Sequence, residues 1–285
     1  MRFRSFFIAL VISIVVTGYV LQATAEGGEQ GCTGSSEWEG DFLLHDRSVV
    51  DSSTNKAALD YMKEVVAAAQ SKKLDDLVVN YKEKVIAEPD SALAHFALGY
   101  AYMVRGEVRY SHLIGEQVVK IKYLEWALRE LAKAVKLDPG LREGVLVLGS
   151  HYVMTNPVKG VAVLKDWLKR NPNDTWAMFW IGMAYGTYSP NNPDQSSYCH
   201  DEQKSLEWFE KAASTAPDIL RFRLTLGRAY ASHVTQGASG NWIVAEPWRS
   251  KAITEFEAVQ KLATETNNPD TAGNAGRTLA KLKAN

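Results

Sequence analysis

Four consecutive side chains in this sequence are of types that bind metals or move protons. They are Cys199, His200, Asp201 and Glu202, and Asp194 lies nearby. Sites for zinc and other transition metals space their ligands apart so that several side chains converge on one ion, and a contiguous run does not match such spacing. We therefore expect no metal here. Asp201 and Glu202 are better placed to begin a helix, where carboxylates accept hydrogen bonds from free backbone amides and oppose the helix dipole.

The motifs of common enzyme classes are absent from the chain. It contains no His-Glu-x-x-His zinc motif, no Gly-x-Ser-x-Gly nucleophile elbow and no phosphate-binding loop. The pair Cys199-His200 resembles the end of a haem-attachment motif, but Ser196 stands where its first cysteine belongs. We expect a non-catalytic protein without a cofactor. An enzyme that uses His200 and Glu202 is the weakest of the alternatives.

The overall charge argues against nucleic acid as a partner. The chain has 32 Lys and Arg against 33 Asp and Glu, a formal net charge of −1. Binding to nucleic acid needs a basic field that neutralises phosphates, and this composition does not supply one. With 46% hydrophobic residues, the chain has ample material for a core.

The N-terminus has the three parts of a secretory signal peptide. Arg2 and Arg4 precede an apolar run over 6–16, and Ala23-Thr24-Ala25 supplies a small-x-small cleavage site. We expect residues 1–25 to be removed and 26–53 to form a flexible leader, which gives a periplasmic or secreted protein that does not span the membrane. An uncleaved anchor is the alternative, although the apolar run is shorter than the ~20 residues that a spanning helix needs.

The chain has two cysteines, Cys32 and Cys199. In an oxidising compartment they are candidates for a disulfide bond that ties the leader to a distant part of the chain. Two free thiols, or pairing between molecules, are the alternatives.

Further along, prolines and glycines recur in a fixed register. A glycine follows each of four prolines by ten residues, with an aliphatic residue immediately before the glycine and a tyrosine three after it. The pairs are Pro89 and Gly99, Pro139 and Gly149, Pro172 and Gly182, and Pro217 and Gly227. Such a period indicates a stack of equivalent supersecondary units. A glycine inside a helix costs about 1 kcal/mol relative to alanine, so close approach of a second helix is expected.

Stripes of small and large residues predict a second helix before Pro139, Pro172 and Pro217, and a fourth second helix at the far end of the chain. The stripes are Ala127, Leu131 and Ala134; Gly160, Leu164 and Trp167; Ser205, Phe209 and Ala212; and Ala252, Phe256 and Val259. Small positions on either side of a large one let two helices pack closely, and the proline ends the helix because it cannot continue the hydrogen-bond ladder.

The Leu-Gly, Tyr, small–large–small and Pro landmarks resemble the tetratricopeptide repeat (TPR) family. The resemblance implies an all-α fold, a right-handed α-solenoid of helix hairpins over 54–285. Its parts are a half-repeat at 54–89, repeats at 90–139, 140–172, 173–217 and 218–265, and a capping helix at 268–285. One departure is that the usual Trp three residues before the Leu is replaced by His95, Val145, Met178 and Arg223.

A second departure lies in the spacing of the repeats. Successive glycines lie 50, 33 and 45 residues apart, whereas the plain repeat is about 34 residues long. The excess falls within hairpins one, three and four, at roughly 104–123, 187–204 and 232–251. The first insert is expected to lengthen its helices, whereas the other two, rich in Pro, Asn, Gly and Ser, are expected to be loops.

In the TPR family the first helices line a concave groove that binds proteins or peptides, and the resemblance implies the same here. The groove positions that we single out as partner-binding are Leu93, Phe96, Tyr100, Leu146, Trp176, Phe179, Met183, Arg221 and Arg228. Such an apolar face exceeds what a typical monomer leaves exposed, so something must cover it. Either a protein or peptide partner binds there or the inserts fold over it. A further alternative is that these positions are plain helix packing and the register is misassigned. A carrier that encloses an apolar small ligand between groove and inserts is the functional alternative.

Overall fold

The computed structural model describes residue 53 and residues 55–107, 114–186, 201–236 and 242–284. Within these ranges the backbone is helical apart from turns and one ribbon of two short strands, which confirms the all-α class. The helices are α4 (Lys56–Gln70), α5 (Leu74–Ala87), α6 (Ala92–Glu107), α7 (Ile114–Leu137), α8 (Arg142–Thr155), α9 (Pro157–Arg170), α10 (Thr175–Gly186), α11 (Glu202–Thr215), α12 (Leu220–Ala231), α13 (Trp248–Glu265) and α14 (Pro269–Ala284).

Several predictions made from the sequence fall outside these ranges. They concern the signal peptide at 1–25, most of the leader at 26–53, the possible disulfide between Cys32 and Cys199, and the side chain of His200. No helix in the described part of the chain is long and apolar enough to cross a membrane.

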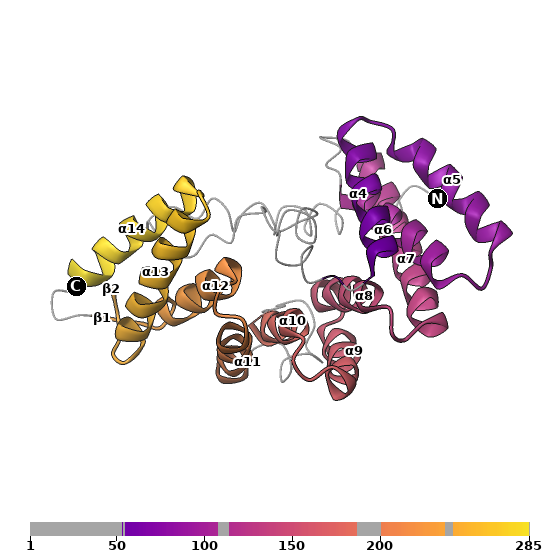
Figure 1. Cartoon of the computed structure of the whole chain (residues 1–285). Helices are drawn as coiled ribbons and strands as arrows, with labels where there is room; N and C mark the ends of the chain where they lie inside the picture. Colours follow the sequence, from indigo (N-terminus) through magenta and orange to yellow (C-terminus); the bar gives the residue numbers. More distant parts are fainter. Residues whose placement is uncertain (1–52, 54, 108–113, 187–200, 237–241, 285) are drawn as a thin grey trace, which may run out of the picture. The chain divides into compact units, whose positions relative to one another are not determined.

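Successive helices pack as hairpins (Figure 1). The pairs are α6 with α7, α8 with α9, α10 with α11, and α12 with α13, and α14 packs on α13. At the N-terminal end, α4 and α5 both pack against α6 more extensively than against each other. The chain is therefore TPR-like in its fold as well as in its repeat pattern, with a first helix and a second helix in each unit.

The repeated glycines lie where the two helices of a hairpin meet. A Cβ atom added to Gly149 would lie 2.5 Å from Leu164 Cδ2, and one added to Gly182 would lie 2.7 Å from the Phe209 ring. The same atom on Gly99 would lie 2.8 Å from Leu131 Cγ. Real Cβ atoms essentially never approach other heavy atoms this closely. The register predicted from the sequence, glycine on the first helix against the large residue of the second, is confirmed.

The turn before α10 holds a buried ion pair. Asp174 accepts hydrogen bonds from Arg142 Nε at 2.8 Å and from Trp167 Nε1 at 2.9 Å, and it caps the backbone amides of Trp176 and Ala177. The Asp174 side chain is 4% exposed. A carboxylate with this many donors is satisfied although it is buried. Through it, the first helix of one unit is joined to the first helix of the next.

The three inserts take different forms. α6 continues to Glu107 and α7 already begins at Ile114, so the first insert lengthens both helices as expected. Most of the second insert, 187–200, lies outside the described residues, and α11 follows its N-cap Asp201. In the third, β1 (Val234–Gln236) pairs antiparallel with β2 (Trp242–Val244). The prediction of a loop at 232–251 was incomplete, because it missed these two strands and placed the start of α13 too late.

In the first and last units, the residue that replaces the usual Trp makes hydrogen bonds; it is His95 in the first and Arg223 in the last. The His95 ring lies 2.6 Å from Glu130 and 3.0 Å from the Pro89 carbonyl oxygen. Arg223, at the equivalent position, donates to the Pro217 carbonyl at 2.6 Å and to Glu255 at 2.9 Å. Both side chains tie the first helix to the preceding turn and to the second helix. Hydrogen bonds therefore replace the packing of an indole at these two positions.

Candidate partner-binding face

The candidate site is the side of the first helices α6, α8, α10 and α12 that holds the positions six and three before, and one and four after, each repeated glycine. It is called here the first-helix face. Helical periodicity places all nine partner-binding residues predicted from the sequence on or beside it. Their exposure differs sharply along the chain. Phe96, Tyr100 and Phe179 are 0% exposed and Leu146 and Trp176 are 1% exposed, whereas Leu93, Met183 and Arg221 are half-buried and Arg228 is exposed.

The aromatic residues of α10 pack against other helices rather than standing free. The Trp176 ring lies edge-to-face with Phe222 of α12, with centroids 4.8 Å apart. Phe179 stacks on the same Phe222 ring at 5.2 Å and also contacts Phe209 of α11 at 5.7 Å. Trp176 and Phe179 therefore help to hold three helices together, and shortening either side chain is expected to reduce stability directly. Whether they also contact a partner stays a prediction.

The open part of the first-helix face lies on α12. Leu224 and Arg221 are half-buried there, and Arg228 is exposed without an ion-pair partner among the residues that the structure describes. An unpaired guanidinium beside apolar side chains suits a partner with an acidic group and an apolar flank. The two arginines predicted from the sequence thus lie at the accessible end of the face.

A buried carboxylate on α8 bonds a residue that lies just before α4. Glu143 lies in the first turn of α8 and is only 4% exposed. The Ser53 hydroxyl, just before α4, donates a short hydrogen bond to Glu143 Oε1. Glu143 Oε2 is buried and has no hydrogen-bond partner among the described residues. Sequence reasoning placed Glu143 on this face but gave no signal of the contact with Ser53, which is 90 positions away.

Another buried polar side chain lies on the same helix. His151 is 8% exposed, and its Nε2 has no hydrogen-bond partner in the described part of the chain. Burial disfavours the charged imidazolium and lowers the pKa of His151. The equivalent residue two positions after the repeated glycine is Ala101, Ala184 or Ala229 in the other units. The second unit therefore holds a neutral imidazole where the others have a methyl group.

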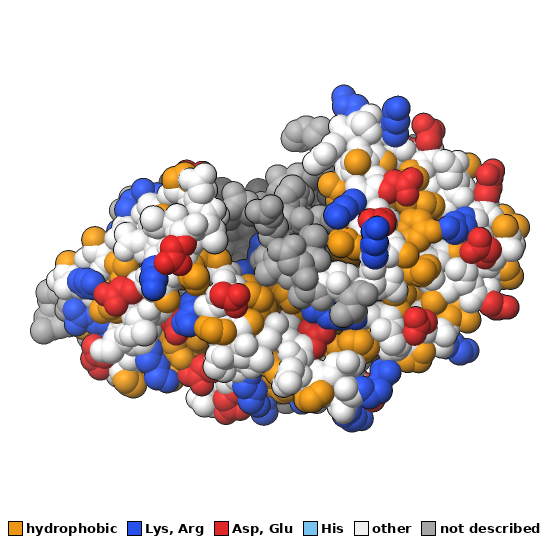
Figure 2. All heavy atoms as spheres, viewed as in Figure 1, with side chains coloured by type: hydrophobic (Ala, Val, Ile, Leu, Met, Phe, Trp, Pro, Cys, Tyr) orange, Lys and Arg blue, Asp and Glu red, His pale blue; other side chains and the backbone are white. Residues whose placement is uncertain are grey.

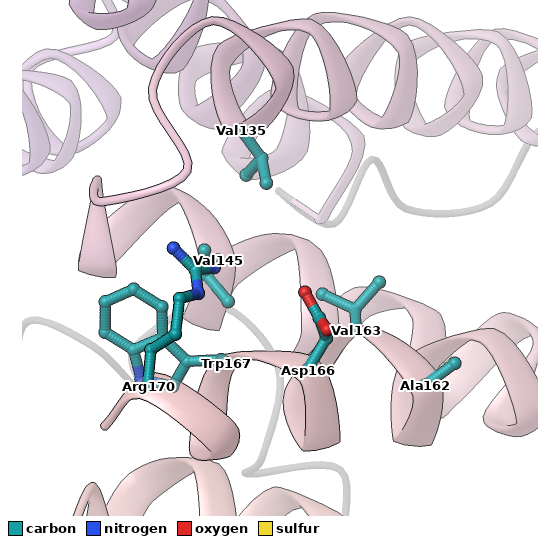
Figure 3. Close-up of a pocket in the computed structure, with 7 residues that line it drawn as sticks. All are labelled: Val135, Val145, Ala162, Val163, Asp166, Trp167 and Arg170. Atoms are coloured by element: carbon teal, nitrogen blue, oxygen red, sulfur yellow. The ribbon is translucent and has the colours of Figure 1, made fainter. Parts of the chain in front are cut away.

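The structure also has an apolar pocket away from the first-helix face, between α7, α8 and α9 (Figure 3). Its volume is about 280 Å³, and it is lined by Val135, Val145, Ala162, Val163, Asp166, Trp167 and Arg170. Arg170 lies over the Trp167 ring at 5.6 Å and donates to the Pro139 carbonyl at 3.1 Å. Val145 is one of the residues that replace the usual Trp, so the pocket lies where a larger side chain is missing.

Of the polar cluster considered first in the sequence, Asp201 and Glu202 lie at the start of α11, whereas Asp194, Cys199 and His200 lie outside the described residues. Asp201 caps α11 by accepting from the Lys204 amide at 2.9 Å, as predicted. The Lys204 ammonium also bonds this carboxylate at 2.6 Å, and these hydrogen bonds lower the pKa of Asp201. Within the described ranges no three His, Cys, Asp or Glu side chains gather as a metal site. Figure 2 shows acidic and basic side chains interspersed over the visible face, without a broad region of one sign.

The comparison with known proteins shows similarity of fold only. No protein-family model and no curated protein matches the chain. A crystal structure of MamA is 19% identical with a TM-score of 0.48, and the match covers 70% of this chain and 95% of that one. The MamA 41-end chain from Desulfovibrio magneticus RS-1 is 13% identical, with a TM-score of 0.42 and coverage of 81% and 98%. YrrB, described as a TPR protein with an unusual peptide-binding site, is 18% identical, with a TM-score of 0.43 and coverage of 81% and 96%.

Proposed function

We propose that this protein is an exported, non-catalytic scaffold that binds a protein or peptide on its first-helix face. The observation that carries the proposal is the α12 end of this face, where Arg228 is exposed next to half-buried Leu224. Stacked helix hairpins present such side chains at regular intervals, which suits an extended or helical peptide. The buried residues of α6, α8 and α10 stabilise the scaffold on which this surface is built.

Export is the part of the proposal that rests on the sequence alone. The basic, apolar and small-x-small segments of residues 1–25 support it. We expect the mature chain to begin near Glu26 and to fractionate as a soluble protein. N-terminal sequencing of exported material tests this, and recovery of Met1 in a membrane fraction would contradict it.

The carrier alternative requires a cavity between the first-helix face and the inserts. The pocket of about 280 Å³ is lined instead by α7, α8 and α9, two of which are second helices. This pocket does not bear on the carrier alternative, because 187–200 and 237–241 of the inserts lie outside the described residues. We favour a macromolecular partner because of the exposed surface on α12.

The binding proposal is testable before the natural partner is known. A random-peptide library displayed on phage is selected on the intact protein, and the recovered peptides are titrated by fluorescence anisotropy. Arg228→Glu should weaken the binding of peptides that carry an acidic group by about tenfold or more, because it replaces an attraction with a repulsion. The matched control is Lys169→Glu on α9, whose side chain is 75% exposed. Equal effects of the two changes, or no recovered peptide, would count against this face as the binding surface.

A further inference from the structure

The pocket between α7, α8 and α9 has two charged side chains at its edge. Asp166 and Arg170 lie four residues apart on α9, so both are on the same side of that helix. They line the pocket together with Val145 and Trp167, and in Figure 3 both extend from α9 toward the side on which Val145 lies. A carboxylate and a guanidinium therefore flank an apolar hollow.

The Arg170 guanidinium is held in place by neutral groups. It donates a hydrogen bond to the Pro139 carbonyl at 3.1 Å and lies over the Trp167 ring at 5.6 Å. Among the residues that the structure describes, no Asp or Glu forms an ion pair with it. Because a guanidinium has five N–H donors, some remain for a carboxylate, and the two neutral contacts reduce the entropy lost when one binds.

The Asp166 carboxylate is accessible to a cationic group. It pairs with the Lys169 ammonium at 3.2 Å, and the two side chains are 65% and 75% exposed. Ion pairs between side chains this exposed contribute little to stability, because water screens them. An ammonium group of a bound molecule can therefore replace the Lys169 ammonium at Asp166.

The other hairpins do not have this pair of charges. The residues equivalent to Asp166 and Arg170 are Lys133 and Leu137 on α7, Lys211 and Thr215 on α11, and Ala258 and Leu262 on α13. The second hairpin is also the one in which two valines, Val145 and Val163, occupy the position of the usual Trp. The hollow and the opposite charges thus occur together in a single unit, as expected of a site that holds a ligand.

The volume of the pocket indicates the size of the apolar group. The pocket measures about 280 Å³, whereas a cavity of about 150 Å³ is enough to bind benzene. Trp167 is oriented by its hydrogen bond to Asp174 at 2.9 Å, so a ring can pack against a fixed indole. We propose that the pocket binds a free amino acid with an aromatic side chain, with its α-carboxylate on Arg170 and its α-ammonium on Asp166. The pocket is separate from the first-helix face, so this proposal and the proposed function can fail separately.

The first test is a titration of the intact protein with L-phenylalanine, followed by nuclear magnetic resonance, which measures weak binding. We expect a Kd of about 1 mM or tighter. Phenylpropanoate, which lacks the ammonium, and phenylethylamine, which lacks the carboxylate, should each bind about tenfold more weakly, because each loses a charge-assisted contact. Absence of phenylalanine binding overturns the proposal. So does N-acetylphenylalanine that binds as tightly as phenylalanine, since that result would identify the C-terminus of a peptide as the ligand.

The second test assigns the binding to this pocket. Arg170→Gln should weaken phenylalanine binding by about tenfold and leave phenylethylamine binding unchanged, because only phenylalanine has a carboxylate. Lys169→Gln is the matched control, since its side chain is 75% exposed beside the pocket and pairs with Asp166, and it should not weaken phenylalanine binding. Val145→Met fills the pocket and should abolish binding while the helical circular dichroism is retained. Unchanged phenylalanine affinity in either Arg170→Gln or Val145→Met would contradict the proposal.

Discussion

A single glycine in α9 allows the two helices of the second hairpin to pack in close contact. A Cβ atom added to Gly160 would lie 2.7 Å from the backbone nitrogen of Val153 and 3.1 Å from the Gly149 carbonyl oxygen. Because these are backbone atoms, no rotamer change can relieve the clash, and the two helices must move apart. Gly160 lies in the small–large–small stripe that the sequence predicts, so the stripe identifies a residue whose lack of a side chain is required.

We predict that Gly160→Ala destabilises the protein by about 1–3 kcal/mol in urea unfolding. Gly273→Ala in α14 is the matched control, because its added Cβ would approach nothing closer than Arg277 Nη1 at 3.7 Å. There the better helix propensity of alanine should be neutral or stabilise by up to about 1 kcal/mol. Equal effects at both positions would mean that the hairpin contact is misplaced.

His151 makes stability depend on pH in a defined direction. Its folded-state pKa lies below the ordinary value of 6.5 because burial disfavours the imidazolium. Just below pH 6.5 the unfolded chain therefore binds more protons at His151 than the folded chain does. The contribution of His151 to stability is complete above that pH and is lost as the pH falls. We predict that His151→Leu flattens the fall in urea midpoint between about pH 7 and pH 5. An unchanged pH profile in the variant would refute this assignment.

At the scale of the helix, one position distinguishes the four hairpins. His95 with Glu130 and Arg223 with Glu255 form polar contacts in the outer units, whereas the middle units have Val145 opposite Val163 and Met178 opposite Trp208 at the equivalent positions. Two valines fill less space than any other pair in this series. The pocket of about 280 Å³ beside Val145 follows from that difference.

Filling this pocket should stabilise the second hairpin. Val145→Met introduces the residue that the next unit already has, and burying the added atoms should contribute about 0.5–1.5 kcal/mol. The reverse change, Met178→Val, should cost about 0.5–1.5 kcal/mol by removing buried volume. Thermal unfolding of both variants checks the pair. A destabilising Val145→Met would show that Trp167 and Arg170 have no room to accommodate it.

The helices themselves were predictable from the sequence, because each has a marked face and a clear stop. Pro89 and Pro217 end helices, and Gly99 and Gly227 mark the faces that meet a second helix, so local residues were sufficient. The ribbon formed by β1 and β2 was missed because three-residue strands carry too few side chains to show a period. The pocket beside Val145 required the positions of three helices, which no local pattern contains.

The candidate site was less predictable than the fold for a related reason. Periodicity shows which side chains share one side of a helix, and Arg228, one of the residues that it selects, is exposed. It does not show which of these side chains are buried by residues that are distant in the sequence. Trp176 is buried against Phe222, and Glu143 is bonded by Ser53, through contacts that join separate helices. Burial at these positions was therefore visible only in the folded chain.

At the scale of the whole molecule, we assign separate roles to two sides of the helix stack. The second helices close the hairpins through large residues such as Leu164 and Phe209. The first helices carry the face that we propose binds a partner. On that face Arg228 of α12 is exposed, whereas Phe96 of α6, Leu146 of α8 and Phe179 of α10 are buried. A partner is therefore expected to contact the α12 end of the face first.

Site-specific photo-cross-linking to a selected peptide tests the central claim most directly. Benzoylphenylalanine is placed either at Leu224, on the first-helix face of α12, or at Val158 on α9, which is 42% exposed. With both labelled proteins folded and mixed with the same peptide, we predict a cross-linked product from position 224 and none from position 158. Cross-linking from 158 and not from 224 would show that the peptide binds the opposite side of the hairpins, and it would contradict the assignment of the first-helix face.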